Sequence, residues 1–88
     1  MGKQLYSDAR EVVRALLRQA RTEAELSQVE LAARLGRPQS YVSDYERSHR
    51  RLDWVGVAEV LEACQHDLLR FTQDYLAATK KKKPNPKG

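Results

Sequence analysis

Two short helices joined by a glycine turn are predicted within residues 26–52, and this stretch constrains the fold more than any other part of the chain. Ser27 and Glu30 have the spacing of a capping box, in which each side chain satisfies a backbone N–H at the start of a helix. Gly36 ends that helix, because glycine adopts the left-handed conformation beyond a helix at little cost. After a turn of about three to four residues, a second helix is predicted from about Gln39 to Arg47.

This second helix has an apolar side and a polar side. Val42 and Tyr45 are expected inside, and the residues expected outside are Gln39, Ser40, Ser43, Asp44 and Arg47. A helix with short polar side chains at its N-terminal end, flanked by arginines, suits the major groove of DNA. The alternative is an ordinary helical hairpin with a solvated face. The agreement of spacing, turn and polar face favours the DNA-binding motif.

The chain as a whole is predicted to be all-α, with one five-helix domain over residues 1–79. A chain of 88 residues forms a single domain, and its apolar residues recur at helical rather than alternating spacing. The three remaining helices are expected to run from just after Ser7 to between Thr22 and Glu25, from Trp54 to about Cys64, and from Leu68 to about Thr79.

Apolar residues at helical spacing define the expected core and one surplus face. Val29 and Trp54 are both placed in the core stripes of their helices, and Asp53 is the expected N-cap of the helix that Trp54 opens. The last helix has a wide apolar face formed by Leu68, Leu69, Phe71, Tyr75 and Leu76. Part of this face must close the domain, and the rest suffices to pack against a second subunit.

The basic charge of the chain is unevenly distributed. Of 16 lysines and arginines, five are lysines within residues 80–88, a run with two prolines that is predicted to be a disordered tail. Residues 1–79 therefore carry 11 basic and 12 acidic side chains. The five arginines from Arg34 to Arg51 face only Asp44 and Glu46, so basic charge gathers around the second helix. Two roles stay open for the tail: added non-specific DNA affinity, or a solubilising end.

Other classes of protein are disfavoured. A single cysteine, Cys64, excludes an internal disulfide and fits a reducing cytoplasm. No apolar run approaches the roughly 18 residues needed to span a membrane, and the N-terminus has no apolar signal core. His49, His66 and Cys64 are scattered and predict no metal site, and no catalytic constellation is visible. We expect a cytoplasmic protein that is not an enzyme and needs no cofactor.

Three consecutive segments carry a family resemblance. A Leu-Ser-Gln-x-x-Leu-Ala pattern and a turn glycine are present as Leu26, Ser27, Gln28, Leu31, Ala32 and Gly36. A Gln-Ser-x-Val-Ser-x-Tyr-Glu-Arg pattern follows as Gln39, Ser40, Val42, Ser43, Tyr45, Glu46 and Arg47, and Arg-Arg-Leu-Asp as Arg50, Arg51, Leu52 and Asp53. With these motifs, residues from about 17 to 69 resemble the lambda repressor-like domain of the Cro/C1 type, also called the XRE family. The resemblance implies a bacterial or phage transcriptional regulator associated with the nucleoid.

The resemblance also implies roles for single residues. Base edges are met by Gln39, Ser40 and Asp44, with Ser43 close to them; the DNA backbone is met by Gln28, Arg47, Arg50 and Arg51. Three neighbours of these positions are further candidates for phosphate contact, namely Arg37, Tyr41 and His49. Arg21 and Glu46 match a pair that forms an ion pair in the family, which would neutralise a carboxylate close to DNA.

The quaternary state follows from the resemblance as well. The family binds two-fold operators as dimers, which implies a homodimeric repressor on a palindromic operator of double-stranded DNA. The alternative is an antitoxin-type interaction module that grips a partner protein through its last helix or tail and autoregulates its operon. Glu25 and Ser48 depart from the pattern, because the family usually has glycine at both positions.

Overall fold

The structure is a computed structural model that describes residues 2–80, with side chains for residues 9–79. Within this range it contains five helices and no strand: α1 (Gly2–Glu23), α2 (Gln28–Leu35), α3 (Gln39–Glu46), α4 (Trp54–Ala63) and α5 (Leu68–Lys80). The predicted all-α fold with five helices is confirmed. The predicted disordered tail falls, from residue 81 onward, outside the described residues.

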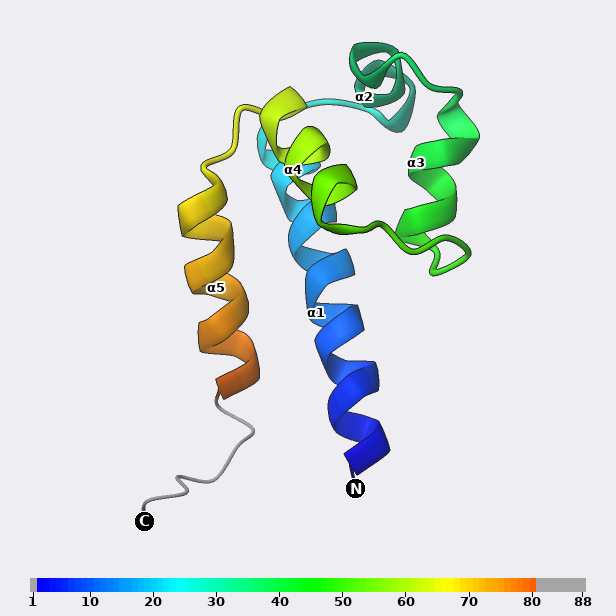
Figure 1. The fold of residues 1–88 in the computed structure, drawn as a ribbon. Helices are drawn as coiled ribbons and strands as arrows, with labels where there is room; N and C mark the ends of the chain where they lie inside the picture. Colours follow the sequence, from blue (N-terminus) through cyan, green and yellow to red (C-terminus); the bar gives the residue numbers. More distant parts are fainter. Residues whose placement is uncertain (1, 81–88) are drawn as a thin grey trace.

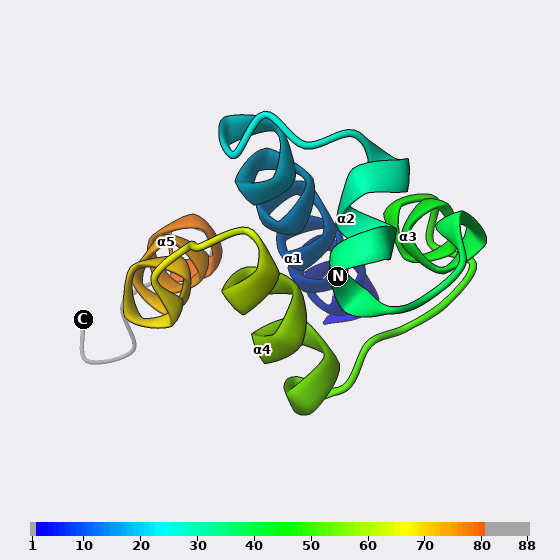
Figure 2. The ribbon, with the colours of Figure 1, turned by 90° about the horizontal axis from the view of Figure 1, so that it is seen from above.

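Helix α1 is the longest element and the others are arranged around it. Helix α5 runs along one side of α1, α3 lies on the opposite side, and α4 packs between them (Figures 1 and 2). Helix α2 packs against both α3 and α4. The largest of the fully buried side chains come from three helices: Leu31 of α2, Val42 of α3, and Val60 and Leu61 of α4. This shared core holds the inner side of α3 and leaves its outer side open.

Three expectations about the helices are wrong. Helix α1 begins at Gly2 rather than after Ser7, since the residues between them include no proline that would break a helix. Val29 is 62% exposed because it lies roughly 200° around α2 from the buried Leu31. Trp54 is also 62% exposed, because it stands in the first turn of α4, at the edge of a buried face centred on Val57, Val60 and Leu61.

The first four helices end in the same way. A residue with positive φ follows each of these helices, directly for Gly36 (68°) and after one intervening residue for Glu25 (59°), Ser48 (69°) and Gln65 (56°). Each is part of a Schellman motif, in which the next N–H bonds back to a carbonyl five residues earlier; His49 N, for example, donates to the Asp44 carbonyl at 2.7 Å. Glu25 and Ser48 thus adopt a left-handed conformation that favours glycine, the residue that the resemblance implies at both positions.

Candidate nucleic-acid interface

The α2–turn–α3 unit has the local geometry that its sequence predicts. The Ser27 hydroxyl accepts from the Glu30 N–H at 3.0 Å, and Glu30 Oε1 accepts from the Ser27 N–H at 2.8 Å, so the capping box is confirmed. These bonds to the Ser27 backbone and side chain hold the pKa of Glu30 below its ordinary value. Gly36 turns the chain after α2, and Pro38 stands at the N-cap of α3.

Helix α3 presents its N-terminal end to solvent while its inner side is anchored. Tyr41, Val42 and Tyr45 are buried, whereas Gln39 and Ser40 are exposed. Ser43 and Asp44, the other two predicted base contacts, are half-buried on the next turn. All four predicted base-contacting residues thus lie on this one helix, with the polar groups of the first two the most accessible.

A chain of hydrogen bonds connects the exposed end of α3 to a buried ion pair. Gln39 Nε2 donates to Gln28 Oε1 at 2.9 Å, and Gln28 Nε2 donates to Glu46 Oε1 at 2.9 Å. A carboxylate only accepts, so the amide nitrogen of Gln28 must face Glu46 and its oxygen must face Gln39. Gln39 therefore has to donate inward, which leaves its oxygen and its second N–H for an outside partner.

The ion pair at the end of this chain joins α1 to α3. Arg21 Nε and Nη2 donate to the two carboxylate oxygens of Glu46 at 2.7 and 3.0 Å, and Arg21 Nη1 donates to the Leu26 carbonyl at 2.9 Å. The side chains are 11% and 4% exposed. The bidentate bond to Glu46 raises the pKa of Arg21, so the guanidinium stays charged and offsets the charge of the carboxylate that it binds.

Tyr41 supports two of the predicted phosphate-binding arginines. The guanidinium carbons of Arg37 and Arg50 lie over its ring, at 4.6 and 5.1 Å from the centroid. The ring packs edge-on against Tyr45, with centroids 5.9 Å apart, and Tyr41 is only 8% exposed. The structure thus brings together an arginine from the turn before α3 and one from the loop after it.

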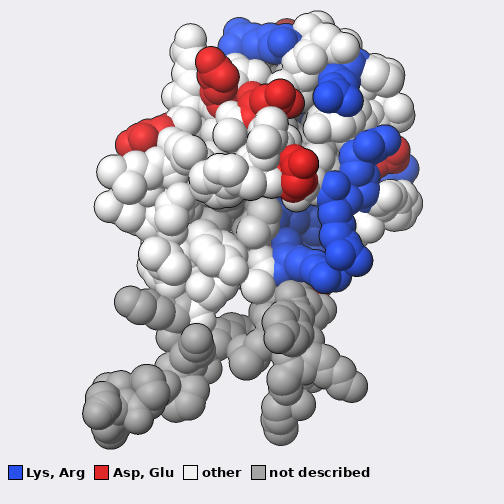
Figure 3. Space-filling view, viewed as in Figure 1, with Lys and Arg blue, Asp and Glu red and all other residues white. Residues whose placement is uncertain are grey.

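The remaining predicted phosphate contacts are exposed side chains at and beyond the end of α3. Arg47 is its C-cap, and His49 and Arg51 follow in the loop. Figure 3 shows arginine side chains gathered over this loop and the adjoining part of α1. Arg14 of α1 joins this surface without having been predicted from the sequence: its Nη1 donates to the Glu46 carbonyl at 3.5 Å, and only the folded chain brings the two segments together.

The predicted dimer residues of α5 divide into two groups. Phe71 is 4% exposed and belongs to the core of this chain, where its ring packs edge-on against His66. Leu69 and Leu76 are 64% and 48% exposed, and Leu68 and Tyr75 are half-buried. Any apolar surface that α5 offers to a partner is therefore centred on Leu69 and Leu76.

Metal-binding side-chain groups and membrane-spanning helices were both sought in the described part of the chain. No group of three or more histidine, cysteine, aspartate or glutamate side chains among these residues could hold a metal ion. None of the described helices has both the length and the apolar character required to cross a membrane.

Fold and interface together define a DNA-binding helix-turn-helix protein. A family model described as a helix-turn-helix domain matches residues 13–74. The chain is also similar to a solved structure, an XRE-family like protein from Pseudomonas syringae pv. tomato str. DC3000, with a TM-score of 0.81 and 36% sequence identity over 86% of this chain and 93% of that chain. No curated protein sequence matches the chain. The chain belongs to the helix-turn-helix family and is a DNA-binding regulator of the XRE, lambda repressor-like type.

Proposed function

We propose that the protein is a homodimeric transcriptional repressor that binds a palindromic operator with α3 in the major groove. The observation that carries this proposal is the fixed amide of Gln39 at the exposed start of α3. Recognition of adenine by glutamine needs one acceptor for N6–H and one donor for N7. Those are the two groups that Gln39 has left after donating to Gln28.

The neighbours of Gln39 would extend this base contact. Ser40 is exposed beside it, and the Ser43 hydroxyl already donates to the Ser40 carbonyl at 3.4 Å, so its oxygen can still accept a hydrogen bond. A carboxylate such as Asp44 can accept from the amino group of cytosine, although it would be repelled by phosphate. We assign these three residues to base contact.

The DNA backbone would be held at both ends of α3. Arg37 and Arg50 would reach it from the surface of the Tyr41 ring, which would position both guanidinium groups. Gln28 has a second N–H for a phosphate, and the exposed Arg47, His49 and Arg51 add cationic or hydrogen-bonding groups along the loop. Each phosphate neutralised steepens the dependence of binding on salt by about 0.9 in log–log slope.

Two subunits would address half-sites about one helical turn apart. Leu69 and Leu76, with Leu68 and Tyr75 beside them, are the apolar surface available for this contact. The antitoxin alternative requires α5 to become ordered on a partner, whereas α5 is folded along α1 in this chain, which supports the repressor. The protein would act in the cytoplasm of a bacterium, or on phage DNA within one.

A salt series of DNA-binding measurements tests the backbone contacts. Arg50→Ala should lower the slope of log K against log salt by about 0.9, and Tyr41→Leu by about twice that, because it releases Arg37 and Arg50 together. Tyr41→Phe keeps the ring and should keep the wild-type slope. Arg70→Ala, the matched change on the exposed surface of α5, should also leave the slope unchanged. Equal slopes for wild type, Arg50→Ala and Tyr41→Leu would overturn the proposed interface.

A further inference from the structure

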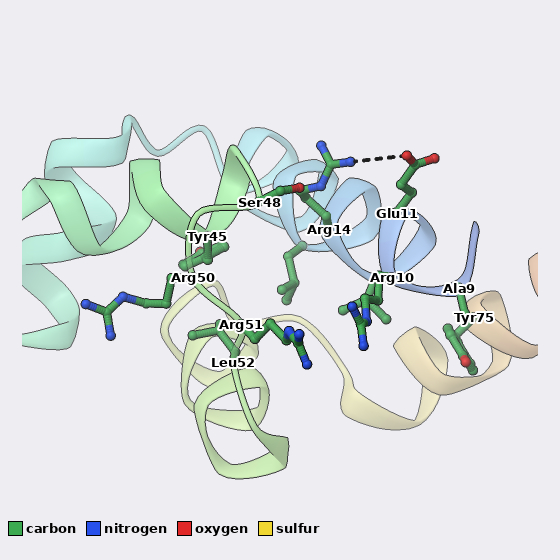
Figure 4. A pocket seen from close by; sticks show the side chains of 12 residues that line it. Ala9, Arg10, Glu11, Arg14, Tyr45, Ser48, Arg50, Arg51, Leu52 and Tyr75 are labelled. Atoms are coloured by element: carbon green, nitrogen blue, oxygen red, sulfur yellow. Dashed lines mark ion pairs between the residues drawn. The ribbon is translucent and has the colours of Figure 1, made fainter. Parts of the chain in front are cut away.

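A groove of about 880 Å³ lies beside the DNA-binding unit, and of its lining residues only Arg50 and Arg51 are also assigned to the DNA backbone. It is bounded by α1, by the end of α3 with the loop that follows it, and by Tyr75 of α5 (Figure 4). A volume of this size falls in the range of small-molecule sites.

The groove is strongly cationic. Arg10, Arg14, Arg50 and Arg51 line it, and the one carboxylate among its lining residues is Glu11. Glu11 forms an ion pair with Arg14 at 3.9 Å, and the guanidinium of Arg50 stacks on the ring of Tyr41. Two arginines therefore remain uncompensated in the groove, Arg10 and Arg51.

Arg10 and Arg51 come from different elements and extend toward each other in the view of Figure 4. No carboxylate among residues 9–79, whose side chains the structure describes, forms an ion pair with either of them. Two guanidinium groups that share one groove repel each other, and an anion placed between them removes that repulsion while accepting charge-assisted hydrogen bonds.

The floor of the groove is apolar. Val13 and Leu17 of α1, Leu52 of the loop and the ring of Tyr45 form it. The hydroxyl of Tyr45 is buried there without a hydrogen-bond partner among the described residues, so it is a donor that a ligand oxygen could satisfy after a small shift of the ring or loop. An apolar floor beside two cations suits a ligand that is charged at one end only.

We propose that this groove binds a small anionic ligand with an apolar body, such as an aromatic carboxylate, between Arg10 and Arg51. The ligand would engage Arg51 and hold the loop that carries Arg50, two of the residues assigned to the DNA backbone. Bound ligand would therefore weaken DNA binding, and by reciprocity DNA would weaken ligand binding. This second step rests on the proposed function, whereas the binding site itself does not.

Titration of the full chain with 2-naphthoate, followed by amide chemical shifts in NMR, tests the site directly. The largest shifts should fall on residues 9–17 and 48–52. Arg10→Gln should weaken binding about tenfold or more, as expected for loss of a charge-assisted hydrogen bond. Arg18→Gln, the same change on exposed α1 surface outside the groove, should bind like wild type. The uncharged 2-naphthalenemethanol should bind far more weakly than 2-naphthoate.

Three results would overturn the proposal: equal affinity for the uncharged analogue, unchanged affinity in Arg10→Gln, or shifts centred elsewhere. Inorganic phosphate is a further ligand to titrate. If it binds as tightly as 2-naphthoate, the groove is a plain phosphate contact and the proposed amphipathic site is wrong. In a DNA-binding measurement, 2-naphthoate should lower the affinity of the wild-type protein for DNA but not that of Arg10→Gln. If 2-naphthoate leaves the DNA affinity of the wild-type protein unchanged, the proposed competition is wrong. If the protein binds no DNA at all, the proposed function fails, while the titration still decides the site.

Discussion

Gln39 Nε2 donates a hydrogen bond to Gln28 Oε1 at 2.9 Å, so the first side chain of α3 is oriented by a side chain at the start of α2. Because Gln28 in turn donates to Glu46, the direction of both amides follows from the charge of that carboxylate. A buried ion pair between α1 and α3 thereby fixes the hydrogen-bonding pattern that α3 offers to DNA.

These linked hydrogen bonds predict that Gln28→Ala reduces base discrimination as well as affinity for DNA. Without Gln28, the amide of Gln39 can rotate, and the preference for the correct base should fall by about tenfold, within the 1–3 kcal/mol of a bidentate contact. The measurement is competitive binding to duplexes that differ at the contacted base pair. Gln19→Ala, which removes another surface amide that donates at 2.9 Å to Glu23, should leave discrimination unchanged.

The coupling can be separated from a direct phosphate contact of Gln28. In a double-mutant cycle with Gln39→Ala, the loss of discrimination in the double variant should be clearly smaller than the sum of the two single losses. Additivity within about 0.5 kcal/mol would show that the two glutamines act independently.

The ion pair of Arg21 and Glu46 should contribute far more to stability than any exposed pair. Arg21→Leu leaves a carboxylate that is 4% exposed without its partner, and should lower the free energy of unfolding by about 3–5 kcal/mol. Glu11→Gln is the control, because it breaks the exposed 3.9 Å contact with Arg14 and should change stability by about 0.5 kcal/mol or less.

Urea denaturation measures both variants of this comparison. The double variant Arg21→Leu with Glu46→Leu should recover much of the loss, since no unpaired buried charge remains. Equal stabilities for Arg21→Leu and Glu11→Gln would contradict the assignment of a buried, structural ion pair.

The features predicted correctly from the sequence are local ones. The Ser27–Glu30 capping box, the turn at Gly36 and the Asp53 cap of α4, which accepts from Gly56 N at 2.8 Å, each depend on residues within four positions of one another. The proximity of Arg21 and Glu46, 25 residues apart, was available only through the family resemblance.

The features that were missed depend on tertiary packing. The exposure of Trp54 is decided by where the buried face of α4 begins, and the burial of Phe71 by how α5 meets α1 and α4. The contact of Tyr41 with phosphate stays a prediction, whereas its place beneath Arg37 and Arg50 was not predicted, because it depends on the path of a loop. Helical periodicity alone specifies none of these three features.

Ser48→Gly should stabilise the protein. Ser48 has φ 69°, a conformation that costs a residue with a Cβ about 1–2 kcal/mol. Glycine removes this cost, but part of the stability gained is lost to the greater entropy of glycine in the unfolded chain. We expect a net gain of about 0.5–1 kcal/mol. Ser43→Gly, inside α3, should instead destabilise. Thermal unfolding of the two variants measures both changes in stability. A loss of stability in Ser48→Gly would contradict the backbone strain inferred at this residue.

The capping box should make stability depend on pH in the acid range. The bonds to Ser27 lower the pKa of Glu30 in the folded state, so its contribution is complete above its ordinary value of 4.5 and is lost as pH falls through the folded pKa. Glu30→Gln keeps a hydrogen bond but cannot ionise, so its stability deficit at pH 7 should shrink below about pH 4.5. Glu59→Gln, on the exposed side of α4, serves as control. A deficit that is constant from pH 7 to pH 3 would refute this account.

The claim that α3 contacts base pairs through Gln39 is tested most directly by selecting bound duplexes from a random DNA pool. The wild-type protein should enrich a palindrome whose half-sites lie about one helical turn apart. Each half-site should contain an adenine that Gln39→Ala no longer selects, while the rest of the enriched sequence is kept. Enrichment of the same adenine by Gln39→Ala, or no enriched sequence with wild type, would contradict the account.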